Sequence, residues 1–292
     1  MIIIKLLGGL GNQMFQYALG RALAVQHQDE LFLDCSFFSE KGSHTPREFE
    51  LDIFDIKASI ASDEHLKAFI PEQPTLLGRI MHRLRGTTPV SKSYHERGHQ
   101  FHPEVFDLRG DMHLIGYWQT EHYFKQVENI IREDFTFKHP ATGLNAELLQ
   151  KINACNAVSL HIRRGDYVTN TSANSFHGLC GLDYYNAAVQ WLMQHEQNME
   201  LFVFSDDIAW AKENLKYELP MTFIDHNTGK NSWEDMRLMS HCKHNIIANS
   251  SFSWWAAWLN PNKEKRVIAP KQWFADTTIN TKDVIPTSWK KL

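Results

Sequence analysis

Ala157-Val-Ser-Leu-His-Ile-Arg-Arg-Gly-Asp-Tyr167 is the stretch that decides both the fold and the site of this chain. Ala157 to Ile162 has the half-apolar pattern of a short strand, and Arg163 and Arg164 open a tight turn at its carboxyl end. Open α/β sheets bind ligands at the carboxyl ends of their strands. Two guanidinium groups there offer forked donors to phosphate oxygens, and Asp166 can hold one of them. We predict an anion site, the alternative being a solvated turn with an Arg-Asp ion pair.

Composition limits the classes of protein that this chain can belong to. Its 292 residues allow one large or two modest domains, and 43% hydrophobic with 22% charged residues is typical of a soluble globular protein. A net charge of -4 argues against a general nucleic-acid binder. The cysteines lie far apart without a C-x-x-C pair, so we expect no zinc site and no disulfides, as in the cytoplasm; they are Cys35, Cys155, Cys180 and Cys242.

No stretch of the sequence has the length or the flanks of a membrane-spanning or signal segment. The apolar start, Met1 to Leu7, is short and lacks a basic n-region, and no apolar run approaches the roughly 18 residues that a span requires. Residues Arg79 to Arg85 form a short basic and apolar patch. A solvated helix face is its commoner meaning, but it allows peripheral contact with the inner membrane.

The first half begins with a strand, a glycine turn and a helix. Ile2 to Leu7 has the pattern of a buried parallel strand, Gly8-Gly-Leu-Gly-Asn-Gln13 follows, and a helix is expected from Met14 to His27. With Asp34 ending a second strand, this order resembles a dinucleotide fingerprint, and an NAD-dependent oxidoreductase is the rival hypothesis. Met14 occupies the position of the third glycine, however, which weakens that hypothesis.

Polar and aromatic side chains mark two further places in this half. The glycine turn presents the amides of Asn12 and Gln13, which suit sugar hydroxyls or a phosphate. A strand predicted over His113 to Gln119 ends in Tyr117, Trp118 and Gln119, and a helix is expected from Tyr123 to Asp134. The aromatic rings suit the apolar faces of a sugar, although the strand by itself favours a place in the core for them.

The polar segment from Phe137 to Gly143 is the predicted linker, which gives an N-terminal lobe over 1–140 and a C-terminal lobe over 141–292. In the second lobe, the apolar run Leu201 to Phe204 leads to Ser205, Asp206 and Asp207. These residues lack D-x-D spacing, so no metal site is predicted. Helix capping competes with ligand contact as their role.

A second anion cradle is predicted where the strand His244 to Ala248 meets Asn249-Ser-Ser-Phe-Ser253 and a Trp-rich helix. Free N–H groups of a first helical turn, serine hydroxyls and the positive end of the helix converge there. The alternative is a serine N-cap on a helix whose tryptophans fill the core. The preceding helix, Ser232 to Cys242, holds Asp235.

Read together and in order, five stretches strongly resemble the motifs of the bacterial α-1,2-fucosyltransferases of glycosyltransferase family 11. They are Gly8 to Gln13, Gly116 to Gln119, His161 to Tyr167, Phe204 to Asp207 and Ile247 to Trp255. The resemblance extends from Met1 to about Phe274. It implies a GT-B-like α/β fold, with two Rossmann-type lobes whose parallel sheets face across a cleft. It also implies an inverting enzyme that moves L-fucose from GDP-β-L-fucose to the 2-hydroxyl of a β-galactoside in a cell-surface or O-antigen glycan, without a metal or another cofactor.

The resemblance also implies roles for individual residues. Arg163 would hold the diphosphate, His161 and Asp235 would contact guanine, and Ser250 to Ser253 would close over the β-phosphate. The expected catalytic residues are Arg163, Asp166 and Asn12. The expected donor-binding residues are His161, Arg163, Arg164, Ser205, Asp206, Asp235, Asn249, Ser250, Ser251, Phe252 and Ser253. The expected acceptor-binding residues are Gln13, Tyr117, Trp118 and Gln119, with lactose or a galactose-terminated glycan as the acceptor.

The chemistry of these side chains agrees with fucosyl transfer, because Arg163 and a helix start would stabilise the charge that develops on GDP. The sequence does not select a general base. Asp166, Glu121, Asp34 and His177 are all candidates, and the departing phosphate is another. No carboxylate stands out by position, so a dissociative pathway with a loose, oxocarbenium-like transition state is preferred. A non-catalytic glycan-binding protein built on the aromatic residues is a third hypothesis beside the transferase and the oxidoreductase.

Overall fold

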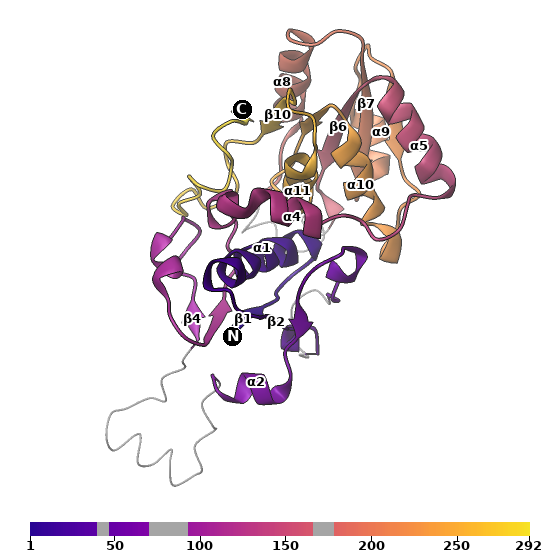
Figure 1. The fold of residues 1–292 in the computed structure, drawn as a ribbon. Helices are drawn as coiled ribbons and strands as arrows, with labels where there is room; N and C mark the ends of the chain where they lie inside the picture. The colour runs from indigo at the N-terminus through magenta and orange to yellow at the C-terminus, as the bar shows by residue number, and fades with distance from the viewer. Residues whose placement is uncertain (40–46, 70–92, 166–177) are drawn as a thin grey trace. The chain divides into compact units, whose positions relative to one another are not determined.

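The computed structural model describes residues 1–39, 47–69, 93–165 and 178–292. The chain forms two units, Met1–Thr136 and Phe137–Leu292, so the division falls at the start of the Phe137–Gly143 segment. Each unit is built on a parallel sheet (Figure 1). The predicted GT-B-like class, α/β with two Rossmann-type lobes, is confirmed. The basic patch from Arg79 to Arg85 lies outside the described residues.

The sheet of the first unit has the strand order β3-β2-β1-β5-β4, and every pairing is parallel. Its central strand is β1, whose Ile2, Ile3 and Ile4 are completely buried, as the continuous apolar run predicts. The strands are β1 (Ile2–Lys5), β2 (Leu31–Asp34), β3 (Ser59–Ile60), β4 (Tyr94–His95) and β5 (Met112–Ile115).

Helix α1 (Leu10–His27) packs on β1 and β2. It approaches closely because Gly20 has no side chain, and a Cβ at that position would lie 2.7 Å from Leu31 Cδ1. The helix begins at Leu10, earlier than the predicted Met14, so Asn12 and Gln13 belong to its first turn. Helix α2 (Asp63–Lys67) belongs to a cluster in which Leu66 and Phe69 pack with Ile3.

The single helix predicted from Tyr123 to Asp134 is wrong. Phe124, with φ -134° and ψ 6°, interrupts it, because its ring is buried against Phe15. Two 3-10 turns, η4 (Glu121–Tyr123) and η5 (Lys125–Val127), therefore precede α4 (Glu128–Asp134). Other 3-10 turns of this unit are η1 (Ser36–Ser39), η2 (Leu51–Ile53) and η3 (Pro103–Asp107).

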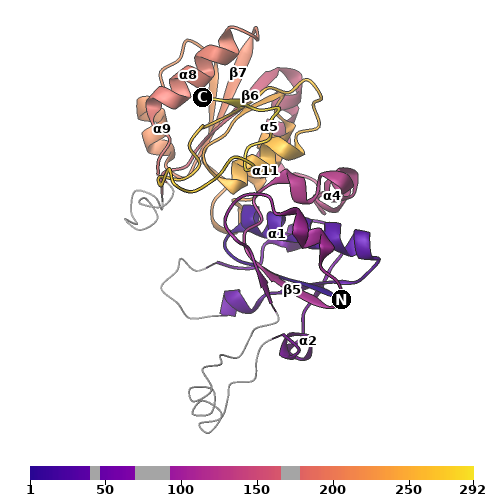
Figure 2. The same ribbon diagram turned by 90° about the vertical axis from the view of Figure 1, so that its left-hand side faces the viewer.

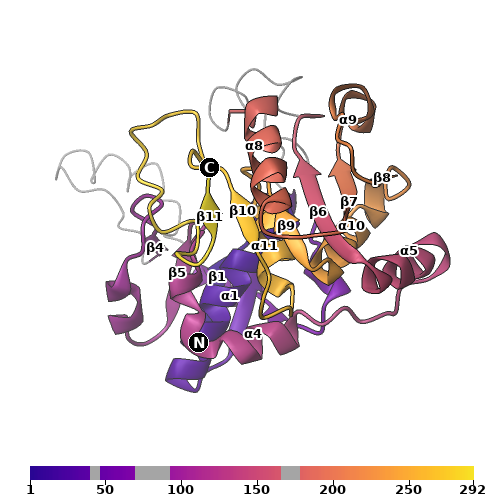
Figure 3. The ribbon, with the colours of Figure 1, turned by 90° about the horizontal axis from the view of Figure 1, so that it is seen from above.

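The second unit contains a six-stranded parallel sheet in the order β11-β10-β9-β6-β7-β8, which Figure 3 shows edge to edge. Strand β6 pairs with β7 along its whole length and with β9 on its other side. Strands β8 and β11 were not predicted. The strands are β6 (Asn156–Ile162), β7 (Met199–Ser205), β8 (Met221–Ile224), β9 (His244–Ile246), β10 (Val267–Ala269) and β11 (Lys290–Lys291).

Helices cover both faces of this sheet. Figure 2 shows α8 (Leu182–Met193) and α9 (Ile208–Asn214) on one side, and α5 (Gly143–Ala154) and α11 (Ser251–Leu259) on the other. Helix α10 (Glu234–His241) packs between α5 and α11, after the 3-10 turn η6 (Gly229–Asn231). The face under α8 is apolar, with Val158, Leu160 and Ile162 of β6 in its core.

The C-terminal end of α11 is held by one ammonium group. Lys265 Nζ donates to the carbonyls of Ala257 at 2.8 Å, Trp258 at 3.1 Å and Asn260 at 2.7 Å. The last carbonyls of a helix have no intrahelical donors, and a cation there also favours the helix dipole. Lys265 therefore fixes the helix whose other end forms the predicted anion cradle.

We predict that Lys265→Met lowers the free energy of unfolding by about 1–3 kcal/mol, because three carbonyls lose a charged donor. Urea denaturation of the purified protein measures the change. Lys263→Met is the matched control: Lys263 is exposed, and its replacement should stay within about 0.5 kcal/mol of wild type. Equal losses in both variants would contradict this role for Lys265.

Candidate functional site

The carboxyl edge of the second sheet collects the predicted donor-binding residues. Strands β6, β7 and β9 are parallel neighbours, so the segments that follow Ile162, Ser205 and Ile246 emerge at one edge. A direct contact joins two of them, since the ring centroids of His161 and Phe252 are 6.0 Å apart. The arginine turn and the serine-rich helix start therefore lie together.

Asp206 holds the arginine turn in place. Its Oδ2 lies 3.0 Å from Arg163 Nη1, and its Oδ1 accepts a hydrogen bond of 2.7 Å from the backbone N–H of Arg164. A Cβ on Gly165 would lie 3.0 Å from the same carboxylate, so the close approach favours glycine. The Arg163 side chain remains 26% exposed.

Three more residues at these two strand ends make contacts within the protein. They are Arg164, Ser205 and Asp207. The Arg164 guanidinium lies 4.0 Å from the centre of the Trp210 ring, and its Nε is 3.6 Å from Asp207 Oδ2. Asp207 also caps α9 by accepting from Trp210 N at 3.2 Å, and Ser205 Oγ accepts from Asp207 N at 2.9 Å. Capping, the alternative weighed for these acidic residues, is thus the geometry at Asp207. Arg164 anchors the turn from which Arg163 projects.

His161 provides a buried, unsatisfied ring nitrogen. Among the described residues its Nδ1 has no hydrogen-bond partner. Burial lowers the pKa of His161 to about 4, with Arg163 lowering it further and Asp206 opposing the change. The imidazole is therefore neutral at pH 7, and Nδ1 can bind a polar group of a ligand.

Helix α11 begins without a capping hydrogen bond from the side chain of its own N-cap residue. Ser250 occupies the N-cap position, but its side chain makes no capping hydrogen bond, and Ser253 Oγ donates instead to Ser250 O at 3.3 Å. The N–H groups of the first turn, around Ser251 and Phe252, thus lack the usual cap and suit an anion. Asn249 is structural: its amide donates to Gly178 O and Trp273 O, both at 3.3 Å.

Asp235, at the start of α10, belongs to a polar cluster that the sequence did not reveal. Asn227 Nδ2 donates to Asp235 Oδ1 at 2.8 Å and to Asn145 Oδ1 at 3.1 Å, and His226 Nε2 lies 2.8 Å from Asn145 Oδ1. His226 and Asn227 follow β8, whose carboxyl end lies at the same edge as Arg163. Burial raises the pKa of Asp235 to about 7, and the nearby carboxylate of Glu234 adds to the shift.

In the first unit, a second set of polar groups follows β1 and β5. Gly8 has φ +74°, and a Cβ there would lie 2.6 Å from Asn12 Nδ2, so glycine is required. Asn12 Oδ1 accepts from Gln119 Nε2 at 2.8 Å, whereas Gln119 Oε1 is buried without a partner among the described residues. Gln13 is fully buried. Its Nε2 donates to Gly8 O and Glu48 O, and its Oε1 accepts from Glu50 N.

The two aromatic candidates differ in exposure. Tyr117 is 39% exposed and can meet a ligand. Trp118 is completely buried, with its ring centroid 6.2 Å from that of Tyr94 and 5.5 Å from that of Tyr123. Its position matches the core alternative rather than an open stacking face.

The residues predicted as candidate general bases differ in their surroundings. Asp166 and His177 lie outside the described residues. Asp34 is buried, with Oδ2 3.2 Å from His113 Nε2, while Glu121 pairs with Lys125 at 3.0 Å. No group of three or more His, Cys, Asp or Glu placed to bind a metal occurs in 1–39, 47–69, 93–165 or 178–292.

The whole chain, residues 1–292, matches the model of Glycosyl transferase family 11. The chain belongs to glycosyltransferase family 11. Across 300 residues it is 37% identical to the α-1,2-colitosyltransferase of Escherichia coli, covering 100% of this chain and 98% of the relative. The O-antigen biosynthesis glycosyltransferase WbnK of Escherichia coli is 33% identical over 304 residues, with 98% of both chains covered. A NodZ α-1,6-fucosyltransferase structure aligns with a TM-score of 0.48 and 13% identity, over 92% of this chain and 94% of that one.

This membership changes the weight of the alternatives. A dinucleotide-binding oxidoreductase would use the glycine turn together with Asp34. Asp34, which would have to reach a ribose, is 2% exposed and faces His113. No helix in the described part of this glycosyltransferase is long and apolar enough to cross a membrane.

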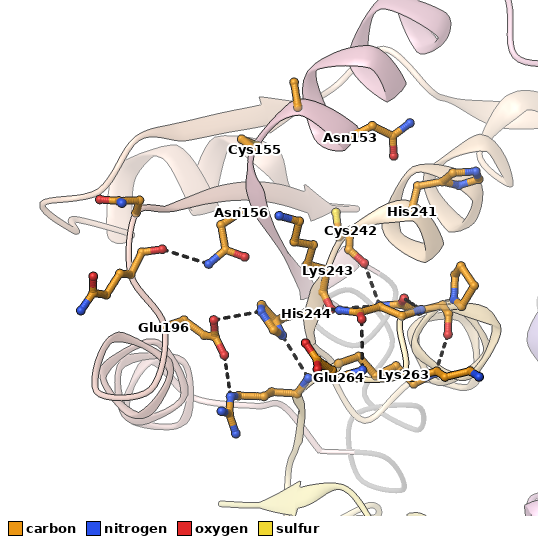
Figure 4. Close-up of a pocket in the computed structure, with 18 residues that line it drawn as sticks. Asn153, Cys155, Asn156, Glu196, His241, Cys242, Lys243, His244, Lys263 and Glu264 are labelled. Atoms are coloured by element: carbon orange, nitrogen blue, oxygen red, sulfur yellow. Dashed lines mark hydrogen bonds and ion pairs between the residues drawn. The ribbon is translucent and has the colours of Figure 1, made fainter.

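A large hollow lies at the opposite, amino-terminal edge of the second sheet (Figure 4). Its polar groups bind one another: Glu196 Oε1 accepts from Arg266 Nε at 2.7 Å, and Asn260 Nδ2 donates to Cys242 O at 2.7 Å. Arg266 N donates to His244 Nδ1 at 3.0 Å. We assign it no ligand in this glycosyltransferase.

The raised pKa of Asp235 predicts a pH-dependent stability. The folded protein holds this proton up to about pH 7, against an ordinary value of 3.8. The stability contributed by the shift is complete below the ordinary pKa and is lost as the pH rises through 7. Asp235→Asn should therefore be more stable relative to wild type at pH 8 than at pH 5, as thermal unfolding without nucleotide would show.

Asp225→Asn is the control for this prediction. Asp225 is bonded to Lys212 at 2.8 Å, and this hydrogen bond lowers its pKa. Its replacement should bring no gain at pH 8. An Asp235→Asn protein whose stability relative to wild type is the same at both pH values would contradict the prediction.

Proposed function

We propose that this protein is an inverting fucosyltransferase that moves L-fucose from GDP-β-L-fucose to the 2-hydroxyl of a β-galactoside, forming an α-1,2 linkage. The observation that carries the proposal is the ring contact of His161 with Phe252, which brings the strand end of Arg163, held by Asp206, to the start of α11 in a family 11 chain. The named relatives support a role in a cell-surface glycan such as an O-antigen. A cytoplasmic location with peripheral membrane contact remains a prediction.

In the proposed reaction, the bond from fucose C1 to the β-phosphate oxygen breaks and its electron pair stays on GDP. Arg163 and the first-turn N–H groups of Ser251 and Phe252 stabilise that charge as it develops. The guanine base is assigned to His161, whose Nδ1 has no partner among the described residues, and to Asp235, whose carboxyl oxygens can accept from base N–H groups.

The acceptor is assigned to the carboxyl edge of the first unit. Gln119 Oε1 is a buried acceptor without a partner in the described chain, and a sugar hydroxyl is a suitable donor. Tyr117 offers an exposed ring for the apolar face of a galactoside. Asn12, bonded to Gln119, orients this amide.

Colitose is a second candidate for the sugar that this protein transfers. The 37% identity with an α-1,2-colitosyltransferase extends over the whole chain, and colitose is the 3-deoxy analogue of L-fucose. Assaying GDP release from GDP-fucose and GDP-colitose, each with and without lactose, distinguishes the two donors. Higher kcat/KM with GDP-colitose would replace fucose as the donor sugar while leaving the site assignments intact.

We predict that Arg163→Ala lowers turnover on the order of 10²–10³-fold, as loss of one oxyanion donor does. GDP release from GDP-fucose with lactose measures turnover, and far-UV circular dichroism should stay native. Arg266→Ala is the control, because Arg266 lies at the opposite edge of the same sheet and should leave turnover near wild type. A folded Arg163→Ala protein with full activity would remove Arg163 from the mechanism.

We also predict that EDTA leaves the rate unchanged, because Arg163 and the α11 start supply positive charge at the leaving group without a metal. The same GDP-release assay, run before and after chelation, tests this. Loss of activity that Mg²⁺ or Mn²⁺ restores would overturn the metal-independent mechanism.

A further inference from the structure

Glu96 is a carboxylate at the carboxyl edge of the first sheet. It directly follows β4, and its backbone N–H donates to Ile115 O at 2.9 Å, which continues the pairing of β4 with β5. Strand β5 lies next to β1. Glu96 therefore lies at the same edge as Asn12 and Gln119, where the proposed function places the acceptor.

The carboxylate of Glu96 is fixed at both oxygens. Oε2 accepts from Tyr117 N at 2.6 Å, and Oε1 accepts from Trp118 N at 3.0 Å. Gly116 leaves the space for it, since a Cβ there would lie 2.4 Å from Glu96 Cβ and 2.7 Å from Oε2. Glu96 thus lies across the turn that presents Tyr117 and Gln119, with a remaining lone pair on each oxygen.

The surroundings of Glu96 set its protonation near neutrality. Burial raises its pKa to about 7, while the two backbone N–H donors and His102 oppose the shift. Burial raises the pKa of the Tyr117 and Tyr123 phenols, and the charge of Glu96 adds to both shifts. Arg97 and Glu104 act on the pKa of Tyr94, which precedes Glu96 in the chain by two residues. With a pKa of about 7, the Glu96 carboxyl group is about half ionised near neutral pH, which suits a general base.

Other described carboxylates near this edge are committed to different partners. Asp34 faces His113, and Glu121 pairs with Lys125. Glu50 Oε2 accepts from Leu10 N at 2.8 Å. Beside Glu96, the unpartnered Oε1 of Gln119 is a second sign that a polar ligand belongs on this turn.

We propose that Glu96 is the general base of the transfer reaction, an inference that rests on the proposed function. Its carboxylate takes the proton of the attacking galactoside 2-hydroxyl. The hydroxyl oxygen then forms a bond to fucose C1, and the bond from C1 to the β-phosphate oxygen breaks with its electron pair on GDP. The carboxylic acid returns the proton to solvent after the product leaves.

The test is the pH dependence of transfer from GDP-fucose to lactose between pH 5 and 9, a range of about two units on each side of a neutral pKa. Wild-type kcat/KM for lactose should fall about tenfold per pH unit below about pH 7. Glu96→Gln keeps one acceptor oxygen for the turn, and should lower kcat on the order of 10²–10⁴-fold and lose this acidic limb. Its KM for lactose should change little.

Two further variants separate catalysis from a structural role. Glu96→Asp, with the carboxylate withdrawn, should be slow but keep the acidic limb. Glu50→Gln removes a different carboxylate, whose Oε2 accepts from Leu10 N, and should also keep the acidic limb. Glu96→Gln with an unchanged limb, or a limb that disappears with Glu50 instead, would overturn the assignment. A wild-type protein that transfers no sugar would refute the proposed function, whereas an active wild type with an unchanged Glu96→Gln profile refutes only the role of Glu96.

Discussion

The parallel pairing of β6 with β7 on one side and β9 on the other decides where the predicted donor-binding residues lie. This pairing brings residues from three distant parts of the chain, around Arg163, Asp206 and Ser251, to one edge of one sheet. The ring contact between His161 and Phe252 closes the arrangement. A one-residue slip of β6 would turn the Arg163 side chain to the other face.

At that edge, Asp206 and Arg164 hold the turn in place, and Arg163 is the residue that we propose to contact the ligand. Asp206 binds both the Arg163 guanidinium and the Arg164 backbone, and Arg164 packs on Trp210. A charge-assisted hydrogen bond from Arg163 contributes about 1.5–3 kcal/mol. A helix terminus adds roughly 0.3–1 kcal/mol. Arg163 should therefore dominate the binding of a diphosphate, with α11 fixing its orientation.

The sequence predicted the fold class and most strands because their apolar runs are local signals. It missed β8, since Met221–Ile224 is short and only partly buried near the sheet edge. It predicted one continuous helix through Phe124. The helix is interrupted there because Phe124 packs against Phe15, which the local sequence does not show. Local pattern cannot show a contact between elements that are distant in the chain.

The same limit applies to the candidate site. Arg163 and the serine cluster stand out because each is a run of chemically distinctive residues at a strand end. Glu96 and Asn145 do not, since each gains its place from partners far away in the sequence, Tyr117 and Trp118 for the first and Asn227 for the second. Trp118 stood out in the sequence, but its aromatic side chain suited both a place in the core and contact with a sugar. Only the structure shows that it is completely buried.

The most direct test of the central claim is a crystal structure of this protein with GDP. The account predicts that the β-phosphate lies within hydrogen-bond distance of both the Arg163 guanidinium and the backbone N–H groups of Ser251 or Phe252. A diphosphate bound elsewhere, or touching only one of these two groups, would contradict it.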